Sequence, residues 1–110
     1  MNVSFEEIGR LAVTLAHENC VSGQPCKLVD NGLVIPCGEG DGFCGFVESV
    51  RGGFAAVQVE GFVTVSVTGG LDVGYVSLCA DGSGGVKAGS GREYLVVCMD
   101  KDSETAVIKL

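Results

Sequence analysis

Basic residues are scarce in this chain of 110 residues, with seven Lys and Arg against fourteen Asp and Glu. The net charge of -7 argues against nucleic acid and anionic membrane surfaces as partners, because both require a clustered basic face. Long apolar runs are also missing: uncharged stretches such as residues 61–71 fall far short of the ~20 apolar residues of a membrane helix. The sequence therefore predicts neither a nucleic-acid partner nor a membrane span.

A secretion signal is not recognisable either. The first ten residues, MNVSFEEIGR, carry acidic side chains where a signal has positive charge followed by an apolar run. We therefore expect synthesis in a cytoplasm, which is a reducing compartment. In that setting the six cysteines are expected to be free thiols packed as small apolar groups (Cys20, Cys26, Cys37, Cys44, Cys79 and Cys98).

Histidine is nearly absent, and this limits both catalysis and metal binding. The single histidine, His17, has no recognisable partner pattern for a nucleophile and its base. Only His17 and Cys20 have the spacing of a zinc ligand pair, and one pair does not make a site. We expect no catalytic residue, no cofactor and no metal, and a surface or core-edge position for His17.

Glycine, in contrast, is abundant. Eighteen glycines, 46% hydrophobic residues and 19% charged residues describe a compact, turn-rich and apolar chain. Its length suits one domain. About eight short segments with strand character alternate with glycine turns, which predicts an all-β fold, a small β-barrel or a tightly coiled β-sandwich. Expected strands cover residues 24–29, 33–35, 43–50, 54–67, 73–80, 93–99 and 104–110, besides one near residues 11–15.

The start of the chain is ambiguous between helix and strand over residues 4–16. Ser4 and Glu7 fit a helix capping box, whereas Leu11, Val13 and Leu15 alternate as in a strand. We favour an irregular arm over residues 1–9 that reaches a neighbouring subunit, followed by the barrel domain over residues 10–110.

Two segments carry the most specific structural signals. Asn31-Gly32 between apolar runs predicts a hairpin with a type I′ turn, which needs positive φ at both residues. In residues 54–67 the odd positions are apolar through Gly61, so we expect one long strand with valines facing inward. Such a strand would span roughly 43 Å and has to bend, and an inward-facing glycine at the bend relieves crowding.

The glycine loop before residue 43 invites a nucleotide or a calcium reading. Residues 40–45 match G-x-G-x-x-G, but they lead into a strand rather than a helix, which favours turn glycines. Glu39 and Asp41 supply too few oxygens for calcium and are expected to be solvated.

Two phenylalanines are expected on the wet face of the long strand. Phe54 and Phe62 occupy even positions on either side of Gln58 and Glu60. Isolated apolar residues on a surface are normal, but the mean hydropathy of +0.40 also fits an apolar contact surface. We therefore predict Phe54 and Phe62 as interface residues.

The order of these motifs resembles a family of short phage and prophage head decoration or capsid proteins. The resemblance lies in residues 23–28, 40–47, 51–59 with Gly61, 80–87 and 91–97. It implies a small β-barrel without enzymatic activity that binds the major capsid protein on the virion surface as a homotrimer or another symmetric oligomer.

Two other function classes stay open. A small-molecule-binding or carrier barrel would need a sizeable apolar cavity with convergent polar groups. A hydrolase that uses carboxylates would need two acids with strongly shifted pKa values in one cleft.

Overall fold

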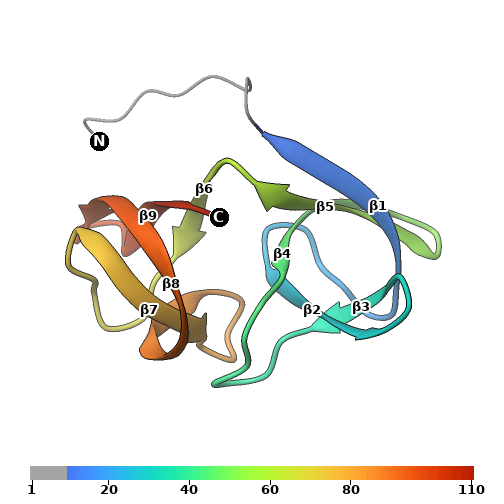
Figure 1. Cartoon of the computed structure of the whole chain (residues 1–110), viewed down its shortest axis with the longest axis horizontal. Coiled ribbons are helices and arrows are strands. Elements are labelled where there is room, and N and C mark those ends of the chain that lie inside the picture. Colours follow the sequence, from blue (N-terminus) through green and yellow to red (C-terminus); the bar gives the residue numbers. More distant parts are fainter. Residues whose placement is uncertain (1–9) are drawn as a thin grey trace.

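The computed structural model describes residues 10–110, which form nine strands and contain no helix (Figure 1). The predicted all-β fold is confirmed. The arm expected over residues 1–9 lies outside the described residues. The strands are β1 (Leu11–His17), β2 (Pro25–Asp30), β3 (Leu33–Pro36), β4 (Gly45–Arg51), β5 (Phe54–Glu60), β6 (Phe62–Ser66), β7 (Gly74–Ala80), β8 (Val86–Asp100) and β9 (Thr105–Lys109).

The first five strands close into a barrel in the order β1-β3-β2-β4-β5. Its neighbours pair antiparallel except for β1 and β3, which run parallel. The segment 11–16 is therefore a strand and not a helix. The prediction of a small single-domain β-barrel or tightly coiled β-sandwich of about eight strands is confirmed, with five strands in a closed barrel and the last four in a second sheet.

The second sheet has the order β6-β9-β8-β7 and curls strongly. Strand β8 turns a corner at residues 89–92, because Ser77 pairs with Glu93 whereas the next residue, Leu78, pairs with Ala88. An isolated parallel bridge between Val67 and Val86 brings the beginning of β8 against the end of β6. The expected strand at residues 93–99 is thus only the second half of a longer one.

Gly61 separates the two sheets. With a φ of 95° at Gly61, β5 ends at Glu60 and β6 begins at Phe62. The prediction of one continuous strand over residues 54–67 was therefore wrong, whereas the predicted bend at Gly61 is confirmed. Residues of the inward phase are buried on both sides of the break, but they fill two cores: Val57 lies in the barrel and Val65 in the second sheet. A positive φ is easy for glycine and strained for other residues.

The Asn-Gly hairpin forms between β2 and β3 as predicted. Its turn is not type I′, because Gly32 has a positive φ of 65° but Asn31 does not. The pairing shifts register between Leu28 and Asp30, and the Asp30 carboxylate accepts the Asn31 N–H (2.7 Å). The chain therefore reverses with a bulge and a local hydrogen bond, and Asn31 does not need the positive φ that a type I′ turn would require.

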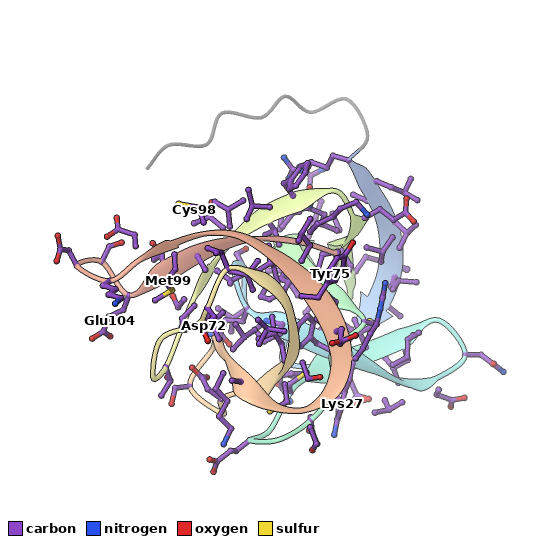
Figure 2. All side chains as sticks on the ribbon, turned by 60° about the vertical axis from the view of Figure 1, so that its left-hand side comes forward. Lys27, Asp72, Tyr75, Cys98, Met99 and Glu104 are labelled. Atoms are coloured by element: carbon purple, nitrogen blue, oxygen red, sulfur yellow. The ribbon has the colours of Figure 1, made fainter. Side chains whose placement is uncertain are left out.

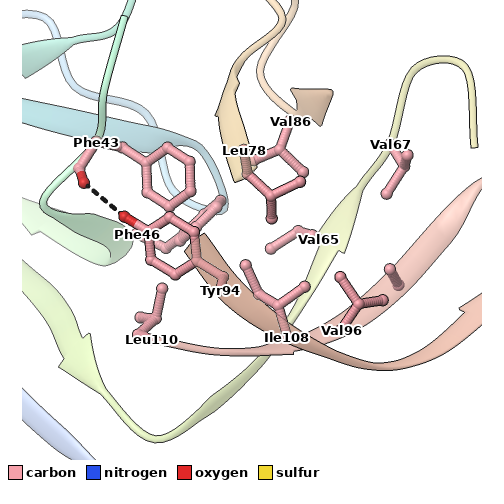
Figure 3. Close-up of a cluster of buried hydrophobic side chains, with 11 residues drawn as sticks. Phe43, Phe46, Val65, Val67, Leu78, Val86, Tyr94, Val96, Ile108 and Leu110 are labelled. Carbon is pink, nitrogen blue, oxygen red and sulfur yellow. Dashed lines mark hydrogen bonds between the residues drawn. The ribbon is translucent and has the colours of Figure 1, made fainter. Parts of the chain in front are cut away.

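Three aromatic rings join the barrel to the second sheet. Phe43 stacks on Tyr94 with 4.8 Å between ring centroids and meets Phe46 edge to face at 5.1 Å. The buried Tyr94 hydroxyl donates a hydrogen bond to the Phe43 carbonyl (3.2 Å), as Figure 3 shows. Residues from β4 and from β8 thus share one core, which holds the two sheets together as a unit.

None of the elements in residues 10–110 is an apolar helix of the length needed to span a membrane.

Candidate interaction surface

Two hairpins flank the end of β1. The Ala16 N–H donates to the Gly32 carbonyl of the β2–β3 hairpin (2.9 Å), and the His17 N–H donates to the Gly53 carbonyl of the β4–β5 hairpin (3.0 Å). In Figure 1 both hairpin loops lie on the right, away from the second sheet on the left. This end of the barrel is therefore built by β1 and by both hairpins.

The two hairpins expose large apolar side chains. Leu28 lies opposite the buried Val34, and Val50 lies opposite the buried Ala55. Cross-strand partners project from the same face of a sheet, so Leu28 and Val50 have the inward phase, yet they are 53% and 42% exposed. The hairpins thus extend beyond the closed part of the barrel and carry its apolar face into solvent.

Phe54 adds a large aromatic ring to this end. It is the first residue of β5, pairs with Ala16 and Arg51, and is 59% exposed. Val29 on β2 is also exposed. We call the four exposed large apolar side chains of the two hairpins the hairpin surface: Leu28, Val29, Val50 and Phe54.

Phe62 lies elsewhere. It begins β6 in the second sheet, pairs with Lys109 and is half-buried. Strand β5 separates it from Phe54 by roughly 20 Å of extended chain. The residue between them, Gln58, was expected on the wet face but is only 3% exposed, because its side-chain amide donates to the Glu60 and Phe62 carbonyls (3.0 and 2.9 Å) and closes the β5–β6 corner.

A second exposed apolar pair lies on the other sheet. Val73 and Tyr75, just before and within β7, are 67% and 73% exposed. Tyr75 projects from the second sheet in Figure 2. It provides an exposed aromatic ring for comparison with Phe54.

His17 has a local structural role. Its Nδ1 accepts the Cys20 N–H (3.2 Å), so Nε2 carries the proton and donates to the Gly52 carbonyl (3.0 Å). Both ring nitrogens therefore bind backbone groups and tie the β4–β5 hairpin to the end of β1. Within residues 10–110 no group of three or more His, Cys, Asp or Glu side chains is placed to hold a metal ion.

The acidic residues of the glycine loop each pair with a lysine: Glu39 is exposed, as expected, whereas Asp41 is half-buried. Asp41 accepts from Lys27 (2.7 Å) and from the Gly38 N–H (2.8 Å), and Glu39 accepts from Lys87 (2.7 Å). The hydrogen bond from the lysine is the main cause that lowers the pKa of each carboxyl group. Both are ionised at neutral pH and fasten the loop to β2 and β8.

Asp81 organises the turn between β7 and β8. Burial opposes its ionisation, but hydrogen bonds from the Ser83 N–H, the Thr68 hydroxyl and the Gly85 N–H leave its pKa lowered. Hydrogen bonds from Ser103 and Asp102 lower the pKa of Asp100 in the same way. These carboxylates hold turns in shape, and none of the four described here with a shifted pKa is a proton donor at neutral pH.

The surface of residues 10–110 includes the following two hollows. One, of about 230 Å³, is lined by Phe46 and Gln58 among others, with Arg10 and Glu48 paired beside it. The other, of about 370 Å³, lies between the 69–72 loop and β8. Ligand pockets usually measure ~300–1,000 Å³ and are lined mainly by apolar side chains. The first hollow is smaller than this range, and the second lies at its lower end. The barrel interior itself is filled, because Cys26, Val34 and Val57 are completely buried there.

No family model matches the chain, and no curated protein matches it.

Proposed function

We propose that this protein is a structural component of a phage or prophage head, a decoration or stabilising protein that binds the major capsid protein on the outer surface of the shell. The hairpin surface carries the proposal. It comprises the exposed Leu28 and Val50, which have the inward phase, together with Val29 and the outward-phase Phe54, all on the two hairpins that flank the end of β1. An exposed apolar surface of this kind is typical of a protein contact.

The rest of the domain suits a protein that lies on the outside of a particle. Within residues 10–110, every buried side-chain nitrogen or oxygen has a hydrogen-bond partner. The barrel has no free edges, and closure of this kind protects strands from unwanted pairing. The closed barrel is the part of the domain expected to resist local opening, which favours survival outside a cell.

The proposal includes self-association, as a trimer or another symmetric oligomer. A surface of four apolar side chains is modest for one contact, but many copies on a lattice multiply weak contacts into strong collective binding. A symmetric oligomer would present several hairpin surfaces to the shell at once.

The same observations support a role without catalysis. His17 is engaged by backbone groups, and the shifted carboxyl groups are ionised and hold turns. The alternative of a carrier barrel has less support, because the barrel interior is occupied by its own side chains.

Binding to heads tests the proposal. Heads purified from a lysogen that lacks this gene are mixed with the protein and sedimented, and the bound fraction is measured against concentration. Two variants are compared, Phe54→Ser at the hairpin surface and Tyr75→Ser on the second sheet, both at exposed positions.

We expect saturable binding of the natural protein and of Tyr75→Ser. Phe54→Ser should bind at least about tenfold more weakly, because a buried phenylalanine contributes ~1.5–3 kcal/mol. Failure of the natural protein to bind would overturn the proposal. Equal binding by both variants would place the contact away from the hairpin surface.

A further inference from the structure

Two thiols from different parts of the barrel wall meet at the edge of its core. Cys26 lies in β2 and pairs with Gly45 of β4, and the Cys44 N–H donates to the Cys26 carbonyl (2.9 Å). The side chains belong to the same core, because Cys26 is buried in it and Cys44 packs against it, and the Cys26 thiol donates to the Gly45 carbonyl next to Cys44 (3.7 Å). Two cysteines that are far apart in the sequence are therefore neighbours across the β2–β4 pair.

The two sulfurs have different surroundings. Cys26 is completely buried in the barrel core, whereas Cys44 is half-buried and packs against the same core. Hydrogen bonding with Cys26 and with the backbone N–H groups of Cys44 and Leu28 lowers the pKa of the Cys44 thiol. Hydrogen bonds to a sulfur favour its thiolate form, and a partly exposed thiolate is the reactive form of cysteine.

The acidities of the neighbouring thiols agree with this asymmetry. The hydrogen bond from Cys26 lowers the pKa of Cys44 to about 7, and the same contact raises the pKa of Cys26. Burial raises the pKa of Cys37 to about 11. Burial also raises the pKa of Cys20. Cys44 is therefore the nucleophile of this group at neutral pH, and Cys26 is the protonated thiol beside it.

We propose that Cys44 and Cys26 form an oxidisable dithiol, a modification site for small peroxides that converts to a disulfide between β2 and the beginning of β4. The proposal stands independently of the head-binding function.

The chemistry balances with hydrogen peroxide as the oxidant. The Cys44 thiolate attacks one peroxide oxygen, the O–O bond breaks, and hydroxide leaves as Cys44 becomes a sulfenic acid. The Cys26 sulfur then attacks the Cys44 sulfur, the S–O bond breaks, and the Cys26 proton leaves with the oxygen as water. Overall, two thiols and one peroxide give one disulfide and two waters.

The bond would fasten the β2–β3 hairpin and the glycine loop into one closed loop. A cross-link over a loop of this size removes freedom mainly from the unfolded chain. We expect the oxidised protein to melt at least about 5 °C higher than the reduced protein.

Peptide mapping tests the proposal directly. The reduced full chain is treated with hydrogen peroxide, free thiols are blocked, and the protein is digested with trypsin without reductant. The peptide 11–27 holds Cys20 and Cys26, and the peptide 28–51 holds Cys37 and Cys44. We expect these two peptides to stay linked, with fragmentation placing the bond between Cys26 and Cys44.

Variants separate the roles of the thiols. Cys44→Ser should abolish the linked pair, whereas Cys37→Ser and Cys98→Ser should keep it. Cys26→Ala keeps an apolar side chain in the core and should leave Cys44 as a sulfenic acid that dimedone traps. Linkage through Cys20 or Cys37, linkage only between molecules, or oxidation of Cys44 without a disulfide in the natural protein would each overturn the proposal.

Discussion

Replacement of Gly45 by alanine adds one methyl group to the barrel and tests how closely β4 and β5 pack there. Gly45 is buried in β4 between β2 and β5, where it pairs with Cys26. A methyl group there would overlap the backbone carbonyl of Gln58 and lie 2.9 Å from Cγ1 of Val57. The backbone φ of Gly45 is outside the left-handed region, so space alone opposes the substitution.

The expected cost follows from which atoms must move. The carbonyl of Gln58 belongs to β5, so it cannot rotate away as a side chain would, and the strands must separate. Overpacking of a well-packed core costs ~1–3 kcal/mol, and a rigid backbone neighbour favours the upper end. We therefore expect a loss of about 3 kcal/mol from a total stability of roughly 5–15 kcal/mol.

Urea unfolding followed by circular dichroism measures this loss. The midpoint should fall while the slope stays constant, since the extent of unfolding does not change. Gly53→Ala is the matched control: its φ is also compatible with alanine and its methyl group would meet no atom within 4 Å. We expect the control within ~0.5 kcal/mol of the natural protein. A Gly45→Ala protein with an unchanged midpoint would refute the proposed packing of β2, β4 and β5.

Three further predictions follow from single contacts. Tyr94→Phe leaves the Phe43 carbonyl without its donor and should cost about 1–2 kcal/mol in the same urea assay; an unchanged midpoint would mean that this bond contributes nothing. The hydrogen bond from Lys27 lowers the pKa of Asp41, so the ionised Asp41 stabilises the folded protein above its unfolded pKa, and this stabilisation is lost as pH falls below about 4. The melting temperature of Asp41→Asn should therefore decline less steeply with acid than that of the natural protein. Parallel curves for the two proteins would contradict the ion pair between Lys27 and Asp41. Iodoacetamide should modify Cys44 with a rate that reaches half its maximum near pH 7, whereas Cys37, with a pKa of about 11, should react slowly even at pH 8; equal rates at both sites would count against the thiolate at Cys44.

Local patterns were sufficient for the strands but not for their partners. Apolar segments between turn signals predicted β2, β4, β7 and β9, alternation predicted β5 as part of a longer strand, and the Asn31-Gly32 pair predicted the first hairpin. The division into two sheets at Gly61 was missed, because alternation passes through the glycine unchanged while its positive φ redirects the chain. The first half of β8 was missed because its glycines read as a loop until β7 pairs with them.

For the candidate sites as well, local patterns predicted some features, whereas others depend on how the strands pair. The outward phase of Phe54 was readable from the sequence, whereas exposure of Leu28 and Val50 was not, because both have the inward phase and become exposed only where the hairpins extend past the barrel. The contact of Cys26 with Cys44 depends on the register of β2 and β4, which no local pattern specifies. Long-range lysine partners of Glu39 and Asp41 were missed for the same reason.

A cryo-electron microscopy map of the proposed phage or prophage heads tests this role most directly. We predict density for this domain on the outer face of the shell, repeated with the symmetry of the lattice, with Phe54 covered by capsid protein or by a second copy. Heads that lack the domain, or that display it with the two hairpins free in solvent, would contradict the proposal.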